Sequence, residues 1–368
     1  MTVAPSIDRS RFRIAEQGEG LTLDELALAT RNHGMPLEAL RYDVTPPGLH
    51  YVLTHYDIPA VDPTSWRLEI GGAVDRPLSM GLDDVLRRPA VTSRVLLECA
   101  GNGRARLEPR PISQPWLLEA VGTAEWTGTP LAPLLQEAGL SPDAVDVVFT
   151  GADHGVERGV EQDYARGLSI ADAMRPETLL VWGMNGAPLP PQHGAPLRLL
   201  VPGWYGMAQV KWLSRIDVLT EPFTGFQNAT AYRLKVDASE DGEPVTRIRP
   251  RALLAPPGWP DFMTRERFVR AGTVPLTGRA WSGRSPVSRV EVSTDGGTTW
   301  SDAVLAPADP AHPFSWRGWT YGWNAEPGAH ELLVRATDEQ GTQPVDQEWN
   351  RQGMANNLVQ RVPVTVVG

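Results

Sequence analysis

Cysteine is scarce in this sequence, because the 368 residues contain a single one, Cys99. One thiol excludes an internal disulfide, a zinc site with several cysteine ligands, a cysteine-ligated iron–sulfur cluster and the C-x-x-C-H attachment of a c-type haem. The seven histidines are scattered. The closest pair, His50 and His55, is not spaced to share one face of a helix, so a histidine-based zinc site is not expected. The G-x-S-x-G, H-E-x-x-H and P-loop motifs are absent as well.

Long apolar runs and an excess of positive charge are also missing. No stretch of about 18 apolar residues occurs, so no membrane span is expected. The first twenty residues lack a charged segment followed by an apolar one and carry no twin-arginine pair, which predicts a cytoplasmic protein. A net charge of −10 argues against nucleic acid as a partner. A local cluster of arginines in such a chain is better interpreted as a site for a small anion or a cofactor phosphate.

The chain has enough length for two domains, since 368 residues exceed what one hydrophobic core usually serves. A segment rich in proline and glycine at 240–262 predicts the boundary, which gives domains 1–245 and 246–368. In the first domain the patterns predict helices at 21–29, 82–87 and 131–138 and strands at 66–70, 95–97, 145–150, 178–182 and 197–201. In the second they predict only strands, at 287–293, 314–323, 330–337 and 358–367. Short strands separated by turns are typical of an all-β sandwich.

The most apolar of these strands ends at Cys99 and is followed by a Gly-Asn-Gly turn at 101–103. Glycine allows the chain to turn sharply and to approach a ligand closely. Arg104, Arg106 and Arg110 follow at once and place positive charge beside a sulfur whose thiolate form is stabilised by cations. Taken alone, Cys99 could equally be a small buried hydrophobic residue.

Other polar residues stand at the ends of expected elements. Arg31, Asn32 and His33 share one loop, which is either a binding loop or a solvated one. Trp116 follows a proline-rich connection and either covers a core or forms the wall of a pocket. Asp153 follows the strand expected at 145–150, where its carboxylate could accept N–H donors of a ligand or stabilise the turn.

The segment 188–212 carries the densest polar signal, because prolines and glycines bracket a short strand. His193, Arg198, Gln209 and Lys211 stand near the ends of that strand. Two cations with an imidazole and an amide suit a ligand that bears a phosphate. As isolated residues they could also be surface groups that keep the protein soluble.

Five motifs, in this order and spacing, resemble the sulfite oxidase family of molybdenum enzymes. They are RNHGMP at 31–36, LLECAGNGR at 96–104, GADHG at 151–155, QHGAPLRLLVPGWYGMAQVKW at 192–212 and WNRQGMANN at 349–357. The resemblance implies an α+β protein, in which a mixed α/β molybdopterin domain is followed by an immunoglobulin-like dimerisation domain. It also implies molybdenum held by a molybdopterin, and a homodimer formed through the C-terminal domain. No haem domain is visible, so the resemblance implies a separate electron acceptor.

The resemblance also assigns roles to individual residues. Cys99 matches the thiolate ligand of molybdenum, a role that suits its soft sulfur. The positions that match cofactor-binding residues are Arg31, Asn32, His33, Asp153, His193, Arg198, Gln209, Val210 and Lys211. The positions predicted from the resemblance to face the substrate are Arg31, Arg104, Trp116, Tyr232 and Gln352.

Two positions depart from the pattern of the family. Ala29-Thr30 stands where relatives usually have a phenylalanine-valine pair before the arginine-asparagine-histidine triplet. Gln352 stands where relatives that oxidise sulfite often place an arginine, and an amide supplies no charge.

The resemblance implies oxidation of sulfite, or of a related small oxyanion, by oxygen-atom transfer at molybdenum. The alternatives are the reductive removal of oxygen from an S-oxide or nitrate, and a protein that carries molybdopterin without catalysis.

Overall fold

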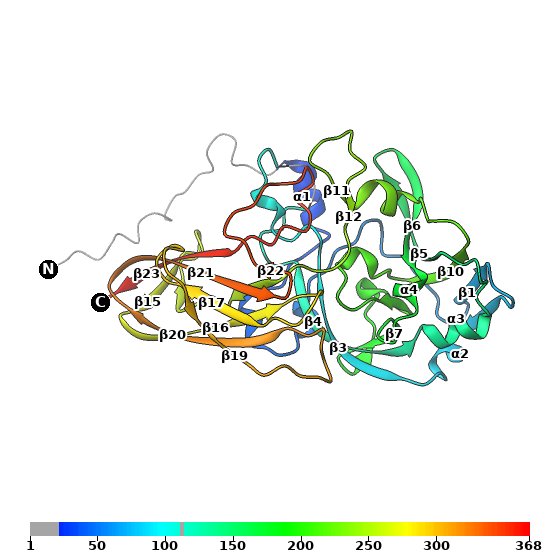
Figure 1. The fold of residues 1–368 in the computed structure, drawn as a ribbon, viewed down its shortest axis with the longest axis horizontal. Coiled ribbons are helices and arrows are strands. Elements are labelled where there is room, and N and C mark those ends of the chain that lie inside the picture. Colours follow the sequence, from blue (N-terminus) through cyan, green and yellow to red (C-terminus); the bar gives the residue numbers. More distant parts are fainter. Residues whose placement is uncertain (1–21, 111–113) are drawn as a thin grey trace.

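Two five-stranded sheets form the first part of the chain (Figure 1), in a computed structural model that describes residues 22–110 and 114–368. The first sheet has the strand order β2-β1-β10-β5-β6, and only its β1–β10 pair is parallel. Its strands are β1 Arg67–Gly72, β2 Leu78–Gly81, β5 Asp146–Glu157, β6 Val160–Ser169 and β10 Leu213–Leu219. The second sheet is antiparallel, with the order β3-β4-β7-β8 and with β9 also on β7. Its strands are β3 Val91–Glu98, β4 Val121–Pro130, β7 Leu179–Met184, β8 Ala187–Pro188 and β9 Arg198–Leu200.

Helices are short and lie at the margins of these sheets (Figure 1). The α-helices are α1 Leu23–Ala29, α2 Leu82–Leu86, α3 Ala132–Ala138 and α4 Ile170–Ala173, and a π-turn, η7, spans Gln227–Ala231. The 3-10 turns are η2 Leu37–Arg41, η3 Pro47–Leu49, η4 Arg104–Arg106, η5 Pro191–His193 and η6 Gly206–Ala208. A capping box between Thr22 and Glu25 precedes α1, which begins two residues after the expected start; residue 21 lies outside the described residues. None of the helices described is long and apolar enough to cross a membrane.

The C-terminal part is a β-sandwich, which lies on the left in Figure 1. One sheet has the order β13-β16-β20-β19, and its strands are β13 Arg251–Leu254, β16 Gly272–Trp281, β19 Val304–Leu305 and β20 Arg317–Ala325. The other has the order β14-β15-β23-β21-β17-β18 with β22 on β21. Its strands are β14 Trp259–Pro260, β15 Arg267–Arg270, β17 Arg289–Ser293, β18 Ser301–Asp302, β21 Gly328–Asp338, β22 Gly341–Thr342 and β23 Gln360–Val367. A small ribbon, β11 Arg233–Leu234 with β12 Glu243–Pro244, precedes the sandwich. The predicted α+β class is confirmed.

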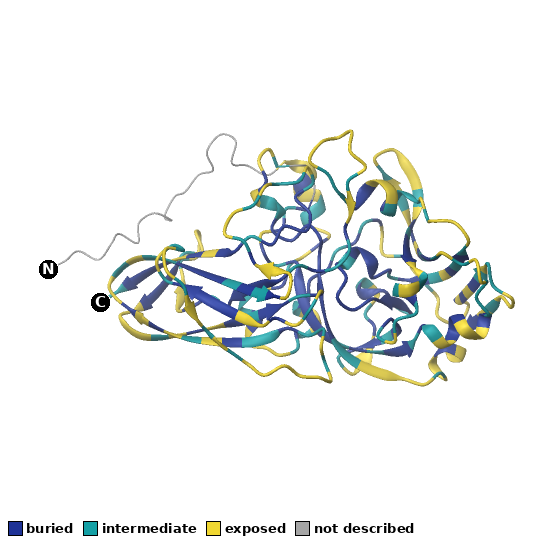
Figure 2. Cartoon of the chain, in the orientation of Figure 1, coloured by how far each residue is buried: buried dark blue, intermediate teal, exposed yellow. Residues whose placement is uncertain are grey.

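The sandwich has its own core, but its inner end also joins the core of the first part. Trp281 and Trp316 from the sandwich, and Met354 from the loop before β23, belong to one buried cluster with residues of both N-terminal sheets. Figure 2 shows this buried zone running through the junction of the two parts. Burying these apolar side chains holds the two parts together, so a boundary near residue 245 separates chain segments that share a core.

Two local predictions need correction. The segment 151–155, expected as a turn after a strand, continues β5 to Glu157, and a β-bulge between Thr150 and His154 absorbs its irregularity. Asp153 therefore lies at a bulge, not at a strand end. The sequence pattern also missed β16, because Pro275 argues against a strand. Its partner β13 pairs only with residues 278–281, so Pro275 faces an unpaired edge where no N–H donor is needed.

A buried ion pair joins the two parts at Glu98, the residue before Cys99. The Glu98 carboxylate, at the end of β3, lies 2.8 Å from Nε of Arg251 on β13, and each side chain is 1% exposed. The other Glu98 oxygen accepts a hydrogen bond of 2.8 Å from the indole N–H of Trp281. Asn102 in the cysteine loop donates to the same carboxylate at 3.1 Å. Two hydrogen bonds and one ion pair therefore satisfy a charge that would otherwise be costly to bury.

We expect Arg251→Met to lower the free energy of unfolding by about 3–5 kcal/mol, because Glu98 would remain buried without its counter-charge. The double variant Glu98→Gln with Arg251→Met should lose less than the single one, since no charge is then left unpaired. Arg289→Met is the matched control, because Arg289 is half exposed where it pairs with Asp302, and it should cost at most about 1 kcal/mol. Urea unfolding followed by fluorescence measures all three. Equal losses for Arg251→Met and Arg289→Met would contradict the expectation.

Candidate active site

Two cavities meet at Cys99. The first, which we call the His193 cavity, is lined by His50, Tyr51, Val52, Leu53, His55, Leu97, Cys99, Ala100, Asp153, Tyr164, Gln192, His193, Arg198, Gly206, Met207, Gln209, Lys211 and Tyr232. The second, the Trp116 cavity, has a volume of about 420 Å³ and is lined by Leu28, Asn32, Leu53, Thr54, His55, Tyr56, Cys99, Gly101, Arg104, Gln114, Trp116, Val156, Glu157, Arg158, Ala231, Tyr232, Gln352 and Met354. Four residues, Leu53, His55, Cys99 and Tyr232, line both. Any group bound to the Cys99 sulfur is thus accessible from two sides.

The turn after Cys99 needs its glycines. Gly103 has φ +94°, and a Cβ there would lie 2.7 Å from the side-chain oxygen of Asn356. A Cβ on Gly101 would lie 2.9 Å from the Arg104 side chain. The Gly101 N–H instead points to the Cys99 sulfur, at 3.4 Å. This turn, itself contacted by Asn356 of the C-terminal part, positions the thiol at the meeting point of the cavities.

Burial raises the pKa of the Cys99 thiol, although the Gly101 N–H, the Arg104 charge and the Trp116 side chain act in the opposite direction. A thiol with a raised pKa is not a free nucleophile at neutral pH. It becomes a thiolate when a metal ion takes the place of the proton. Among the described residues no group of three His, Cys, Asp or Glu side chains could hold a metal, so further ligands would have to come from a cofactor.

The His193 cavity contains buried polar atoms that have no hydrogen-bond partner among the described residues. They are His50 Nε2, Asp153 Oδ1, His193 Nε2 and Arg198 Nε. The Arg198 guanidinium is 4% exposed and is held by the backbone oxygens of His193, at 2.9 Å, and Gln209, at 3.3 Å. Burial lowers the pKa of His193 to about 2, and nearby cations add to this, so its imidazole is neutral.

These unpartnered groups test whether a molybdopterin would fit. An unmade buried hydrogen bond is costly, so such atoms are expected to meet a ligand. Arg198 and Lys211 would face an anionic phosphate, and Asp153 and His193 would face the polar edge of a heterocycle. Cys99 offers the soft sulfur that molybdenum accepts. The chemistry of these residues therefore fits this cofactor.

The Trp116 cavity gathers four of the residues predicted to face the substrate. Arg104, Trp116, Tyr232 and Gln352 line it, and Arg104 donates to the backbone oxygen of Gln352. The Tyr232 hydroxyl and His55 Nε2 are hydrogen-bonded at 2.8 Å. Burial lowers the pKa of His55 to about 4 and raises the pKa of Tyr232, so both are neutral near pH 7. The cavity therefore combines a cationic wall with neutral hydrogen-bonding groups.

Three predicted residues do not line either cavity. Arg31 is exposed and pairs with Asp57 at 2.8 Å. His33 is exposed, and its backbone pairs with that of Val52. Val210 is fully buried in the core.

Two further predicted residues hold neighbouring backbone segments in place through hydrogen bonds. Asn32 accepts a hydrogen bond of 2.7 Å from the Thr54 N–H and donates to Gln114, which fixes the loop before His55. The Gln209 side chain bonds both backbone groups of Val201 and so holds the chain beside β9.

Sequence reasoning missed the part played by the segment from His50 to His55. The spacing of His50 and His55 bears only on a zinc site, whereas their segment forms one wall of the His193 cavity. The rings of His50 and His193 meet edge to face at 5.3 Å. The concentration of aromatic and apolar residues at 49–56 is the signal that could have indicated a half-buried wall.

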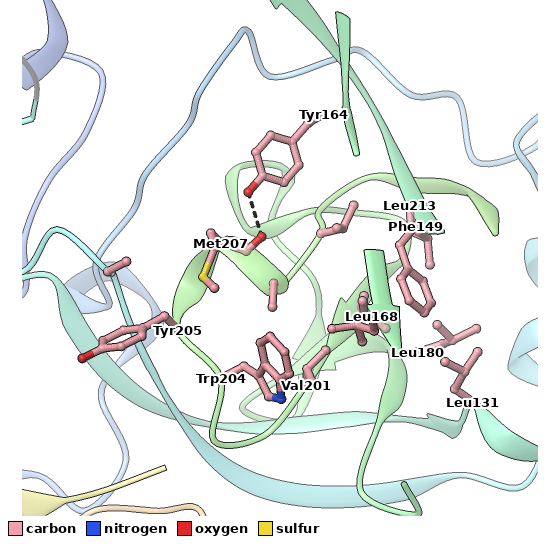
Figure 3. Packing of buried hydrophobic residues seen from close by; sticks show 14 of the residues in the cluster. Leu131, Phe149, Tyr164, Leu168, Leu180, Val201, Trp204, Tyr205, Met207 and Leu213 are labelled. Atoms are coloured by element: carbon pink, nitrogen blue, oxygen red, sulfur yellow. Dashed lines mark hydrogen bonds between the residues drawn. The ribbon is translucent and has the colours of Figure 1, made fainter. Parts of the chain in front are cut away.

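Tyr164, on β6, is a second residue that the sequence did not single out. Its hydroxyl donates a hydrogen bond of 2.7 Å to the backbone oxygen of Met207, as Figure 3 shows. This bond ties the loop containing η6 to the first sheet, within the same cluster as Trp204 and Tyr205. The floor of the His193 cavity is thereby fixed by packing and by a buried hydrogen bond.

Comparison with family models agrees with this geometry. Residues 55–227 match the oxidoreductase molybdopterin binding domain, and residues 261–367 match the Mo-co oxidoreductase dimerisation domain. A solved structure, the sulfane dehydrogenase SoxCD from Paracoccus pantotrophus, superposes with a TM-score of 0.77 at 24% identity, over 97% of this chain and 96% of that one. At that identity the likeness shows the fold.

Curated relatives include both sulfite oxidases and nitrate reductases. The mitochondrial sulfite oxidase of Mus musculus is 33% identical over 88% of this chain and 62% of its own length. The NADH nitrate reductase of Solanum lycopersicum is 32% identical over 91% of this chain and 40% of its own length. The chain thus spans about two fifths to three fifths of these relatives. With both family models in order along it and the corresponding fold, the chain belongs to the sulfite oxidase family of molybdopterin-dependent oxidoreductases.

Proposed function

We propose that this enzyme oxidises sulfite, or a related small oxyanion, to sulfate and passes the electrons to an external acceptor. The observation that carries the proposal is the position of Cys99 between a cavity suited to an anionic cofactor and a cavity walled by Arg104. The overall reaction converts sulfite and water to sulfate, two protons and two electrons. Similarity to mouse sulfite oxidase supports this substrate.

The residues of the His193 cavity would hold the cofactor. Cys99 would bind molybdenum through its sulfur, and Arg198 and Lys211 would offset the charge of the phosphate. When bound, the molybdenum centre supplies the transfer of one oxygen atom and takes up two electrons. His193 and Asp153 would each gain a partner for a polar atom that now has none.

The residues of the Trp116 cavity would orient the substrate. Arg104 would hold the anion by charge, and its own position is fixed by the bond to the Gln352 backbone. The buried walls at Trp116 and Tyr232 limit access of water, so these electrostatic contacts are stronger than they would be in solution. The neutral imidazole of His55 is hydrogen-bonded to the Tyr232 hydroxyl, which would fix both groups in the wall of the substrate cavity.

A second candidate is the reductive reaction, in which nitrate, two protons and two electrons give nitrite and water. Two observations favour it. Nitrate reductases are among the relatives, at 32% identity for Solanum lycopersicum. Gln352 adds an amide, not a charge, to the Trp116 cavity, which suits a monoanion better than it suits sulfite. The cavity volume of about 420 Å³ accommodates either anion.

The C-terminal sandwich is proposed to form a homodimer. It matches a dimerisation domain over residues 261–367. A closed two-fold pair is the commonest arrangement of homo-oligomers.

Assays in both directions separate the candidates. With sulfite and an artificial electron acceptor, we expect turnover that falls at least about 100-fold in Arg104→Ala, because the charge that holds the anion is lost. The parallel assay uses a reduced dye with nitrate or with a sulfoxide. Turnover in the second assay alone would overturn the proposed substrate. Purified protein that carries the cofactor but is inert in every assay would favour a carrier without catalysis.

The metal assignment is tested by composition. We expect about one molybdenum and one pterin per chain in the native protein, because Cys99 is the single thiolate available. Cys99→Ser should change the metal's X-ray absorption spectrum by the loss of one sulfur neighbour, while Arg41→Gln, a surface control, should not. Native protein without molybdenum or pterin, purified from a host that makes the cofactor, would contradict the assignment.

The assignment of the phosphate site predicts a pH dependence in the cofactor-free chain. Burial lowers the pKa of Lys211 from its ordinary value of 10.5 to about 7, and Arg198 adds to this. Between these values the unfolded chain binds one proton more than the folded chain, so the free energy of unfolding rises with pH in this window. Between about pH 7.5 and 9.5 we expect Lys211 to contribute a rise of about 2 kcal/mol, absent in Lys211→Met. Urea unfolding at both pH values measures this; the same rise in Lys211→Met would contradict it.

A further inference from the structure

The tip of the β5–β6 hairpin places a second cation at the Trp116 cavity. Arg158 lies in the turn between the two strands and lines the cavity with Arg104 and Gln352. Arg158 has φ 51° and the next residue, Gly159, has φ 79°. Two successive positive φ angles are typical of a tight hairpin turn, but an arginine rarely takes the first of these positions. Figure 1 shows this hairpin rising at the same edge of the molecule as α1, whose Leu28 also lines the cavity.

Arg158 has no partner within the part of the chain that the structure describes. No hydrogen bond or ion pair forms between its exposed side chain and any described residue. Its charge nevertheless acts on Arg104 inside the cavity. Burial lowers the pKa of the Arg104 guanidinium, and the positive charge of Arg158 adds to that lowering. Two like charges near one another repel, and a bound anion relieves this repulsion.

The acidic residue that lines the Trp116 cavity is the neighbouring Glu157. Its carboxylate accepts a hydrogen bond of 2.9 Å from the Gln227 side chain, next to the Trp116 cavity. Gln227 is buried, so this bond fixes the carboxylate to η7. Glu157 therefore reduces the positive potential of the cavity, whereas Arg158 increases it.

We propose that Arg158 determines which anion the site prefers: it supplies, from the hairpin tip, the second positive charge that Gln352 does not provide. The proposal rests on the proposed function only in taking the Trp116 cavity as the substrate site. Arg104 binds the anion from the loop after Cys99, and Arg158 binds it from the β5–β6 hairpin. Two cations favour a dianion over a monoanion, because the interaction energy grows with the charge of the ligand.

Anion binding to the holoenzyme tests this without turnover. Sulfate serves as the dianion and nitrate as the monoanion, both measured by isothermal titration calorimetry. In Arg158→Gln we expect sulfate to bind about five-fold more weakly and nitrate at most about two-fold more weakly, because an exposed charge acts through solvent. The difference for sulfate should shrink when salt is raised from about 20 mM to about 200 mM.

Two further variants are measured in the same way, one expected to strengthen binding and one expected to leave it unchanged. Glu157→Gln should strengthen sulfate binding, since it removes the negative charge beside Arg158. Arg41→Gln removes an exposed arginine outside both cavities and should leave binding unchanged. The circular dichroism spectrum confirms that each variant is folded.

The outcomes distinguish the inference from the proposed function. Sulfate binding that is equal in Arg158→Gln and Arg41→Gln would overturn the role of Arg158. An equal loss for sulfate and nitrate would overturn its preference for the dianion. If sulfite is not turned over but Arg158→Gln still weakens sulfate binding selectively, the proposed substrate fails and the inference stands.

Discussion

The buried ion pair between Glu98 and Arg251 is the interaction on which the site depends. It joins the residue before Cys99 to the first strand of the C-terminal sandwich, with both side chains 1% exposed. Charges removed from water must be fully paired, which restricts the two parts to one relative placement. The same junction includes Asn356, whose side chain donates to the Asn102 backbone oxygen at 2.9 Å. The loop that carries the thiol is therefore held by contacts with the C-terminal part of the chain as well as with its own sheet.

This placement gives the two cavities different electrostatic characters. The His193 cavity is buried, so Arg198 and His193 cannot be stabilised by water, and burial lowers the pKa of each. An anionic ligand would reverse this cost by supplying the missing counter-charge. The Trp116 cavity is reached from the surface hairpin, where Arg158 is screened by solvent. The His193 cavity is thus suited to an anionic ligand that supplies a counter-charge, and the Trp116 cavity to a small anion.

Much of the fold was predictable, because hydrophobic alternation and turn residues act locally. The strands around Cys99, the helices at 82–87 and 131–138, and the late sandwich strands all lie within a few residues of their predicted positions. The failures have local causes. Pro275 argued against a strand where β16 lies, and a β-bulge allows β5 to continue beyond Gly151 and Gly155. The positions of Arg31 and His33 outside the cavities could not be read from their motif, because a loop's residue types do not fix the direction it faces.

The sequence by itself determined the chemistry available to this protein: one soft sulfur, a glycine turn after it, and two basic segments far apart in the chain. It also determined the family, since five motifs occur in a specific order. Only the tertiary structure decided which groups share a cavity. It brought His55 and Arg158, which no motif singled out, to the residues around Cys99, and it turned Arg31 toward Asp57. The reason is physical, because composition and periodicity report only local preference. Side chains from distant segments meet through long-range packing, which brings the β5–β6 hairpin and the C-terminal loop to the residues around Cys99.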